Sequence, residues 1–446
     1  MIKNKTIILV CKETFSFPFY FLGKELEKNN EVHYFFITHT ESIIKNQFNK
    51  KSYFYFKRKI DHKYIHDTSE LAVKFIENRK NINYMKIPYI SQDHSRYKSY
   101  NLPCFNIGRE MDEYFIDAYN KNRSQGDIDL KKYTKEVEDY RAQSNIMPEI
   151  DKNHVTSSYN YSFKELVKRI LVKTFIFIKQ LYKSKDSEYK IPFNTPLFNN
   201  IFKRYLSSIS YPVKKFYLYS KFNKLFKIPE DEKYIYLPLH MLPESSTFTK
   251  VPMHVNEANL VEAISKSLPI SWKLYVKEHQ AMVGRRKMEF YKKIKKFHNV
   301  KIVKSNFYKD PKPWIENSLG VVTITGTTAF EASMLNKPAI VFGNVFYNVI
   351  PGIKVATCFE DLENLLKIIE TDKWPKDNTL DCAAYIKTVK EIGTNFNIKS
   401  LNSLSEKKIE LEFLETAEHN KLTDMINNLM MFFENAKNIY DNSKKK

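Results

Sequence analysis

The second half of the chain alternates short apolar runs with segments of helical character, and this alternation limits the fold more than any other feature. Five apolar runs have the length of strands, at residues 233–239, 273–277, 300–304, 320–324 and 339–342. Four segments between them have helical character, at residues 256–267, 287–297, 313–318 and 328–335. Strands separated by helices predict an α/β domain with a parallel sheet covered on both faces.

The beginning of the chain predicts a second unit of the same kind. An apolar run near residue 10 is followed by helical spacing over residues 17–29 and by a strand over residues 31–37. Such a β-α-β unit has parallel strands and a right-handed crossover by default. We therefore expect two Rossmann-like domains, one in each half of the chain.

Turn signals between residues 184 and 230 indicate a linker, and we place the domain boundary near Pro229. The prediction is an N-terminal domain over residues 1–228 and a C-terminal domain over residues 229–446. The first contains a helical, basic segment at about residues 111–228, and the second ends in a long helix at residues 421–440. That helix carries an apolar stripe, which we expect to pack back across the domains.

Several kinds of site are missing from the sequence. The chain has only nine glycines, and the first β-α turn has neither a GxGxxG nor a P-loop pattern, which argues against dinucleotide and P-loop chemistry. Its four cysteines form no CxxC pair, and no HExxH, GxSxG or aspartate-rich pattern occurs, so we expect no metal and no cofactor. The short first apolar run resembles neither a signal peptide nor a membrane span, which predicts a cytoplasmic protein.

Candidate functional residues follow the predicted strands of the second half. Ligands of an open parallel sheet bind beyond the carboxyl ends of the strands. His240 and Glu244 follow the first strand, and His279 lies in the loop after the second. A lone histidine is more often structural, but three converging titratable groups favour an acid/base or leaving-group site, so we predict His240 and Glu244 to be catalytic.

The loop after the fourth strand predicts an anion site. Thr325, Gly326, Thr327 and Thr328 lead directly into a helix, where backbone N–H groups and hydroxyls favour phosphate. The alternative is a capping box between Thr328 and Glu331, which would leave the other three residues free. Positive charge for a diphosphate or sugar phosphate would come from the loop after the second strand, namely from Lys277, His279, Arg285 and Arg286.

The formal net charge of +21 is concentrated in one segment. Residues 161–230 contain 15 lysines and arginines against 4 acidic residues. Within them, residues 163–183 predict an amphipathic helix whose cations include Lys168, Arg169, Lys173 and Lys179. Such a segment is typical of a solvated face, of a nucleic-acid patch or of a surface that binds anionic lipid.

Three stretches together resemble the capsule polysaccharide biosynthesis family, bacterial glycosyltransferases that include Kdo-transferring enzymes. They are residues 238–244 with a PLHxxPE-like pattern, residues 277–285 with a KEHP-like start, and residues 323–332 followed by Lys337-Pro and Phe342-Gly. The resemblance covers roughly residues 234–347. Gln280 stands where the family usually has proline, so His279 lacks the neighbour that would fix its orientation.

The resemblance implies a GT-B-type architecture in which the C-terminal domain binds a nucleotide sugar. It places His279 and residues 325–328 on the donor phosphate, as in sialyltransferase-like relatives. The donor it implies is a CMP-linked ulosonic acid, such as Kdo or a sialic-acid-like sugar, ahead of a UDP-sugar. The acceptor would be a capsule or other surface glycan, free or lipid-linked. Since a lipid-linked acceptor is held at the inner leaflet, we expect residues 163–183, through Lys168, Arg169, Lys173 and Lys179, to bind its anionic surface peripherally.

Two other functions remain open at the level of the sequence. A non-hydrolysing UDP-sugar epimerase shares the two-domain layout and would use paired histidine and glutamate residues. A nucleic-acid-binding protein would use the basic segment, although no nucleic-acid motif occurs and we expect no such partner. The carboxylate that decides the stereochemistry of sugar transfer is expected in the first domain, where the candidates are Asp93, Glu110, Asp112 and Glu113.

Overall fold

The protein divides into two compact units in the computed structural model. One unit consists of residues 1–125 and 386–446, and the other of residues 126–385. The structure describes the following residues: 3–11, 16–36, 65–67, 109–146, 162–183, 196–221, 225–242, 251–279, 282–304, 307–308, 310–393, 401, 403–405, 408 and 416–443.

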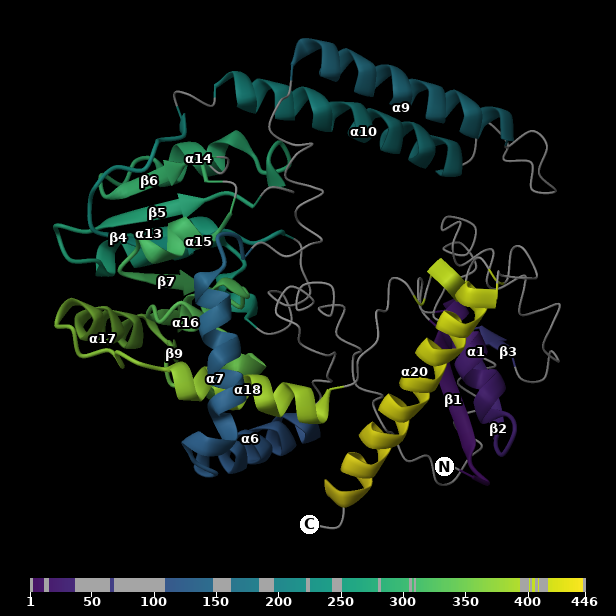
Figure 1. Ribbon diagram of the computed structural model, residues 1–446. Coiled ribbons are helices and arrows are strands. Elements are labelled where there is room, and N and C mark those ends of the chain that lie inside the picture. The colour runs from purple at the N-terminus through teal and green to yellow at the C-terminus, as the bar shows by residue number, and fades with distance from the viewer. Residues whose placement is uncertain are drawn as a thin grey trace. The chain divides into compact units, whose positions relative to one another are not determined.

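A six-stranded parallel sheet forms the core of the unit over residues 126–385 (Figure 1). Its strands are β4 (Tyr234–Pro238), β5 (Lys273–Lys277), β6 (Val300–Val303), β7 (Gly320–Thr323), β8 (Ala339–Val341) and β9 (Ile353–Val355). They lie in the order β6-β5-β4-β7-β8-β9, and every pair is parallel. This is the strand order of the doubly wound fold, with its reversal between β4 and β7. The predicted Rossmann-like domain is confirmed, and β9 extends it by one strand.

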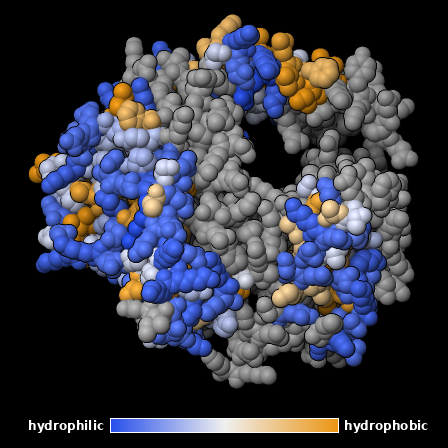
Figure 2. All heavy atoms as spheres, in the orientation of Figure 1, coloured by the Kyte–Doolittle hydropathy of each residue, from blue (hydrophilic) through white to orange (hydrophobic). Residues whose placement is uncertain are grey.

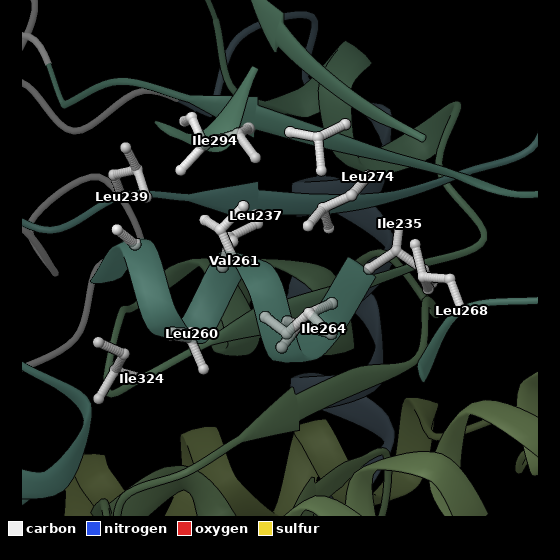
Figure 3. Close-up of a cluster of buried hydrophobic side chains, with 14 of the residues drawn as sticks. Ile235, Leu237, Leu239, Leu260, Val261, Ile264, Leu268, Leu274, Ile294 and Ile324 are labelled. Atoms are coloured by element: carbon white, nitrogen blue, oxygen red, sulfur yellow. The ribbon is translucent and has the colours of Figure 1, made fainter. Parts of the chain in front are cut away.

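Helices cover both faces of this sheet because successive side chains of each strand point to opposite faces. Ile235 and Leu237 of β4 pack against Val261 and Ile264 of α13, as Figure 3 shows. Tyr236, between them, lies on the other face beside the ring of Trp314. The helices on the first face are α13 (Glu257–Ser267), α14 (Met288–Ile294) and α17 (Phe359–Glu370), and those on the second are α15 (Lys312–Glu316) and α16 (Thr328–Met334).

Short 3-10 helices and one further helix complete this part of the chain. Their bounds are η4 (Pro252–His254), η6 (Phe346–Val349) and α18 (Thr379–Ile392). The helix α7 (Asp127–Ala142) packs against α16, where Arg141 Nε donates to the carbonyl oxygen of Met334 at 2.7 Å. Lys312 in turn donates to the carbonyl oxygens of Arg141 and Gln143, both at 2.6 Å. These bonds tie α7 to the sheet domain.

The other unit contains a three-stranded parallel sheet in the order β1-β2-β3. Its strands are β1 (Thr6–Cys11), β2 (Glu31–Phe36) and β3 (Ile65–Asp67), and α1 (Ser16–Leu26) connects the first two. This confirms the predicted β-α-β unit. The helix α20 (Thr416–Ser443) packs against α1 and α6 (Arg109–Ser124), and it buries Leu422, Ile426 and Leu429. The apolar stripe predicted for the last helix is thus buried against N-terminal elements.

The division into units differs from the boundary expected near residue 229. Residues 126–228 group with the six-stranded sheet, and residues 386–446 group with the three-stranded one. The physical reason is packing: Arg141 holds α7 to α16, and Leu218 is part of the hydrophobic core around α13. Tertiary contacts of this kind leave no composition signal at the boundary.

A helical hairpin occupies much of the segment that was expected to be a linker. The predicted helix appears as α9 (Phe163–Lys183), and it pairs with α10 (Pro196–Ser220), which the turn signals had concealed. Pro196 is the first helical residue, where proline costs no hydrogen bond. Pro212 lies inside α10 and is buried, so packing compensates for the backbone bond that it removes. The linker prediction is therefore wrong for residues 196–220.

The core of the six-stranded unit can be tested by one deletion. Ile264 is fully buried on α13, so Ile264→Ala should lower the free energy of unfolding by about 2–5 kcal/mol through lost burial and a cavity. The protein has three tryptophans, Trp272, Trp314 and Trp374, all buried in this unit, so urea unfolding followed by tryptophan fluorescence reports on it alone. The control Ile270→Ala, at a 96% exposed position, should change stability by less than about 0.5 kcal/mol. Equal effects of the two substitutions would contradict this packing.

Candidate functional site

The candidate site lies where the strand order reverses, between the ends of β4 and β7. His240 follows β4, and its Nε2 lies 3.4 Å from Thr323 Oγ1 and 3.4 Å from the backbone N of Thr325. Gly326 approaches closely, because a Cβ there would lie 2.6 Å from Thr323 Oγ1 and 3.4 Å from His240 Nε2. The structure brings His240 together with residues 325–326, a contact that the sequence did not predict, at the switch point where ligands of such sheets bind. The convergence predicted for His240, Glu244 and His279 stays a prediction, because Glu244 lies outside the described residues.

Glu257 orients His240 from the other side of the imidazole ring. Its Oε1 accepts the backbone N–H of His240 at 2.7 Å and lies 3.4 Å from Nδ1. A carboxylate beside Nδ1 favours a proton there, which leaves Nε2 free to accept from the loop after β7. Burial acts to raise the pKa of Glu257, but its contacts with His240 and the charge of Arg286 outweigh burial and hold that pKa below its usual value.

Arg286 connects this pair to the end of β5. Its Nη2 lies 2.7 Å from Glu257 Oε2 and donates to the carbonyl oxygen of His240 at 3.1 Å, while its Nε donates to Glu278 Oε2 at 2.8 Å. The hydroxyl of Tyr291 donates to the same Glu278 oxygen at 2.6 Å. Burial raises the pKa of Glu278, whereas Arg286 and Tyr291 act in the opposite direction. One guanidinium thus bridges two buried carboxylates from different elements.

The loop after β7 has hydrogen-bonding capacity left over. The helix α16 begins at Thr328 with Thr327 as its N-cap, and the Thr327 side chain makes no capping hydrogen bond. The alternative of a capping box with Thr328 as N-cap does not hold, since Thr328 is already the first helical residue. Tyr347 holds the loop by donating to the carbonyl oxygens of Thr325 and Gly326, at 3.0 and 2.8 Å.

The hydroxyl of Thr325 is buried and has no hydrogen-bond partner in the structure. An unsatisfied buried hydroxyl costs about 1–3 kcal/mol. Thr327 and Thr328 beside it are partly exposed. A buried hydroxyl without a hydrogen-bond partner, next to partly exposed hydroxyls, is the pattern expected of a loop that binds a polar ligand.

The remaining predicted residues lie at several places. Lys277 ends β5 beside Pro238 of β4, and its Nζ lies 6.0 Å from the centre of the Trp314 ring. His279 is half-buried two residues further on, and Arg285 is exposed with its guanidinium 5.2 Å from the Tyr211 ring centre. Lys277 and His279 thus lie at the strand end next to β4.

Other predicted residues have little or no description. Glu331 is buried on α16. Glu244 and Asp93 lie outside the described residues. Glu110, Asp112 and Glu113 belong to the start of α6, but their side chains are likewise outside the description.

Sequence reasoning missed most of the residues that hold the site together. Glu257 is the first residue of α13, and Tyr291 lies on α14, so neither follows a strand. Glu278 was visible only as part of a charged loop. A signal did exist: acidic residues at a helix start and at a strand end, with an arginine nearby, are the elements of a buried ion-pair network.

The residues that the structure describes contain neither a metal-binding cluster nor a membrane-spanning helix. Within that part of the chain, no group of three or more histidine, cysteine, aspartate or glutamate side chains could hold a metal ion. No helix that the structure describes is both long and apolar enough to cross a bilayer.

Fold and site together define an α/β protein with a cluster of polar groups at the switch point of a doubly wound sheet. Residues 232–365 match the family model described as "Capsule polysaccharide biosynthesis protein". This match covers less than a third of the chain and overlaps residues 234–347, where the sequence itself resembles that family. No curated protein matches the chain.

Solved structures give remote likenesses. A UDP-GlcNAc 2-epimerase from Methanocaldococcus jannaschii is 15% identical, over 87% of this chain and 100% of its own, with a TM-score of 0.28. The β-Kdo 2,7 transferase KpsC from Thermosulfurimonas dismutans is 12% identical, over 86% and 90%, with a TM-score of 0.31. The wall teichoic acid polymerase TagF is 14% identical, over 51% and 66%, with a TM-score of 0.26.

The buried ion-pair network predicts very different roles for two adjacent arginines. Arg286→Leu leaves two buried carboxylates without their cation and should destabilise the protein by about 3–5 kcal/mol at neutral pH. Arg285→Leu removes an exposed cation over Tyr211 and should cost at most about 1 kcal/mol. Urea unfolding of both variants measures the difference.

The pH dependence of the Arg286→Leu variant provides a second readout. Without the arginine, the pKa values of Glu257 and Glu278 in the folded state should rise above those in the unfolded state. The folded state then binds more protons, so stability falls as pH rises. The deficit relative to the wild type should be smaller at about pH 5 than at about pH 7. A deficit that is independent of pH would contradict the carboxylate network.

Proposed function

We propose that this protein transfers a sugar from a nucleotide donor to a capsule or other surface-glycan acceptor, free or lipid-linked. The observation that carries the proposal is the meeting of His240 with the loop after β7 at the switch point of the sheet. The family match over residues 232–365 supports the same conclusion independently. The donor that we propose is a CMP-linked ulosonic acid, ahead of a UDP-sugar.

In this proposal the loop after β7 holds the donor phosphate. Thr327 and Thr328 offer partly exposed hydroxyls and first-turn backbone N–H groups, and Gly326 lets the ligand approach the backbone. Lys277 and His279 at the neighbouring strand end, with Arg285 further out, supply positive charge. Donors fixed in advance stabilise the negative charge that develops on a leaving phosphate, and this is commonly the largest contribution to catalysis.

His240 is proposed to act on the leaving group. In the reaction the bond between the sugar carbon and the phosphate oxygen breaks, and a bond to an acceptor oxygen forms. When the imidazole is doubly protonated, Nε2 no longer accepts from Thr325 and would deliver its proton to the departing phosphate oxygen, while Glu257 stabilises the imidazolium at Nδ1. The acceptor hydroxyl loses its proton to a base, for which Glu244 is the proposed residue.

The donor site can be tested at Thr327. Because this side chain makes no capping bond, Thr327→Val should leave the melting temperature without ligand unchanged. Loss of a hydrogen bond to phosphate should weaken nucleotide binding by about 1.5–3 kcal/mol, roughly ten- to a hundredfold. The measurement is a thermal-shift screen of CMP, UDP and their sugars, followed by calorimetric titration of the nucleotide that binds.

Thr371→Val is the matched control. Thr371 is exposed at the end of α17, where its hydroxyl donates to the carbonyl oxygen of Lys367. It should bind nucleotide as the wild type does. If Thr327→Val also binds with unchanged affinity, the phosphate does not lie on this loop. Product analysis separates the alternatives: an epimerase converts a UDP-sugar without any acceptor, and a nucleic-acid-binding protein retains nucleic acid on a filter with a steep salt dependence.

The chemical role of His240 is tested by separating turnover from binding. His240→Gln should lower kcat by about 10²–10⁴-fold and change the donor dissociation constant far less, because a proton transfer is made only in the transition state. Tryptophan fluorescence of the variant checks that the six-stranded unit is intact. A raised KM with normal kcat would instead assign His240 to substrate positioning.

A further inference from the structure

The hairpin of α9 and α10 uses only one side of each helix for internal packing. Thr174 Oγ1 and the Tyr205 hydroxyl lie 2.9 Å apart, and the Phe177 ring stacks on Tyr205 with 4.3 Å between ring centres. Nearer the start of α9, Phe163 meets Phe216 at 6.1 Å. These pairs run in opposite chain directions, so the helices are antiparallel and their facing sides are occupied.

The outer sides of the hairpin expose large apolar residues. On α9 they recur every four residues and therefore share one side of the helix. On α10 the spacing of four, seven and four residues also selects one side. Figure 2 shows orange atoms gathered over this hairpin. The residues are Val167, Leu171 and Phe175 on α9, of which Leu171 is 63% and Phe175 67% exposed, and Phe202, Leu206, Val213 and Tyr217 on α10.

Cations lie among these apolar side chains. The two helices contain ten lysines and arginines and a single acidic residue, Glu165, which pairs with Arg169 at 2.9 Å. The exposed lysines are Lys164, Lys168 and Lys173 on α9 and Lys203 and Lys214 on α10. The outer surface of the hairpin is thus apolar and strongly positive at once.

The C-terminal part of α10 packs the hairpin against the core of the six-stranded unit. Leu218 near the end of α10 is 2% exposed within the core around α13. The backbone of Lys215 lies against Gly284, where a Cβ would come within 2.7 Å of Lys215 Cα. Arg285 of the same loop lies over Tyr211. The base of the hairpin therefore contacts the loop after β5, which belongs to the proposed donor site.

This combination distinguishes between possible partners. The cores of protein interfaces are depleted in lysine, because burying an ammonium without a partner is costly. At an anionic bilayer surface, by contrast, lysines remain hydrated beside lipid phosphates while apolar side chains enter the boundary of the acyl chains. We propose that the outer face of the α9–α10 hairpin binds an anionic lipid bilayer, lying along its surface.

The first test compares a tryptophan on the outer face of the hairpin with a tryptophan at an exposed position outside the hairpin. Phe175→Trp should shift its emission to the blue and be quenched by brominated lipid when vesicles of phosphatidylcholine with phosphatidylglycerol are added to the full-length protein. Ile270→Trp, at a 96% exposed position in a turn of the six-stranded unit, should respond to neither. Absence of a shift at residue 175, or equal shifts at both positions, would overturn the proposal.

The second test separates charge from apolar contact. Replacing Lys168 and Lys173 by Gln should weaken binding to these vesicles by about twentyfold, since each lysine near the surface contributes roughly fivefold. The matched control replaces Lys292 and Lys296, two exposed lysines at α14, and should bind as the wild type does. Leu171→Asn with Phe175→Asn should abolish binding even at low salt.

Two further measurements are binding to vesicles of phosphatidylcholine alone and the oligomeric state of the protein in solution. Binding should be stronger on the anionic vesicles and should weaken as salt is added. If the wild type fails to co-sediment with anionic vesicles at physiological salt, the proposal is wrong. A dimer that dissociates in the Leu171→Asn, Phe175→Asn variant, without vesicle binding, would assign the face to a second copy of the chain. None of these measurements involves sugar transfer, so they stand apart from the test of the proposed function.

Discussion

The contact of Arg286 with two buried carboxylates is the interaction on which the candidate site depends. A parallel sheet brings the ends of β4 and β5 together but leaves the following loops free to diverge. Arg286 joins Glu257 at the start of α13 to Glu278 at the end of β5, and it also binds the carbonyl oxygen of His240. Removing three groups of this kind from water is expensive, and a buried ion pair is weak evidence for stability. What the network provides here is a defined geometry: His240 is held at its backbone and at its ring, with Nε2 directed toward the loop after β7.

That geometry places unmet polar capacity at one point of the fold. Thr325 has a buried hydroxyl without a partner, and the N-cap residue Thr327 leaves its hydroxyl unused for capping. Gly326 has no Cβ, which avoids the steric clash with Thr323 that any other residue would make here. Substitutions that satisfied these hydroxyls or filled this space would raise the stability of the fold, whereas a binding loop needs the same groups available to its ligand. Arranged groups that need not reorganise when charge develops are the basis of electrostatic catalysis, which agrees with the proposed transfer from a nucleotide donor.

Much of the second sheet was predictable, because its strands are buried on both faces and are therefore continuously apolar. The predicted helix over residues 163–183 also appears with the same bounds. By contrast, α10 was concealed by Pro196 and Pro212, since proline signals a break unless its position in the helix is known. The network around Arg286 was missed for another reason: its acidic residues and arginine were present in the sequence, but Glu257 and Tyr291 are far from one another in the chain, and nothing in local periodicity pairs them.

The sequence by itself determined the alternation of strands and helices, the loops in which ligand-binding residues would lie, and the family resemblance that residues 238–244 and 323–332 carry. These properties are local, since each depends on side-chain periodicity or on a short motif. The tertiary structure alone decided that residues 126–228 join the six-stranded sheet, that Glu257 lies behind His240, and that the outer side of α9 stays exposed while its inner side packs on α10. Such properties depend on which surfaces contact each other in the fold. The free energy of those contacts comes from pairs of residues that lie far apart in the sequence.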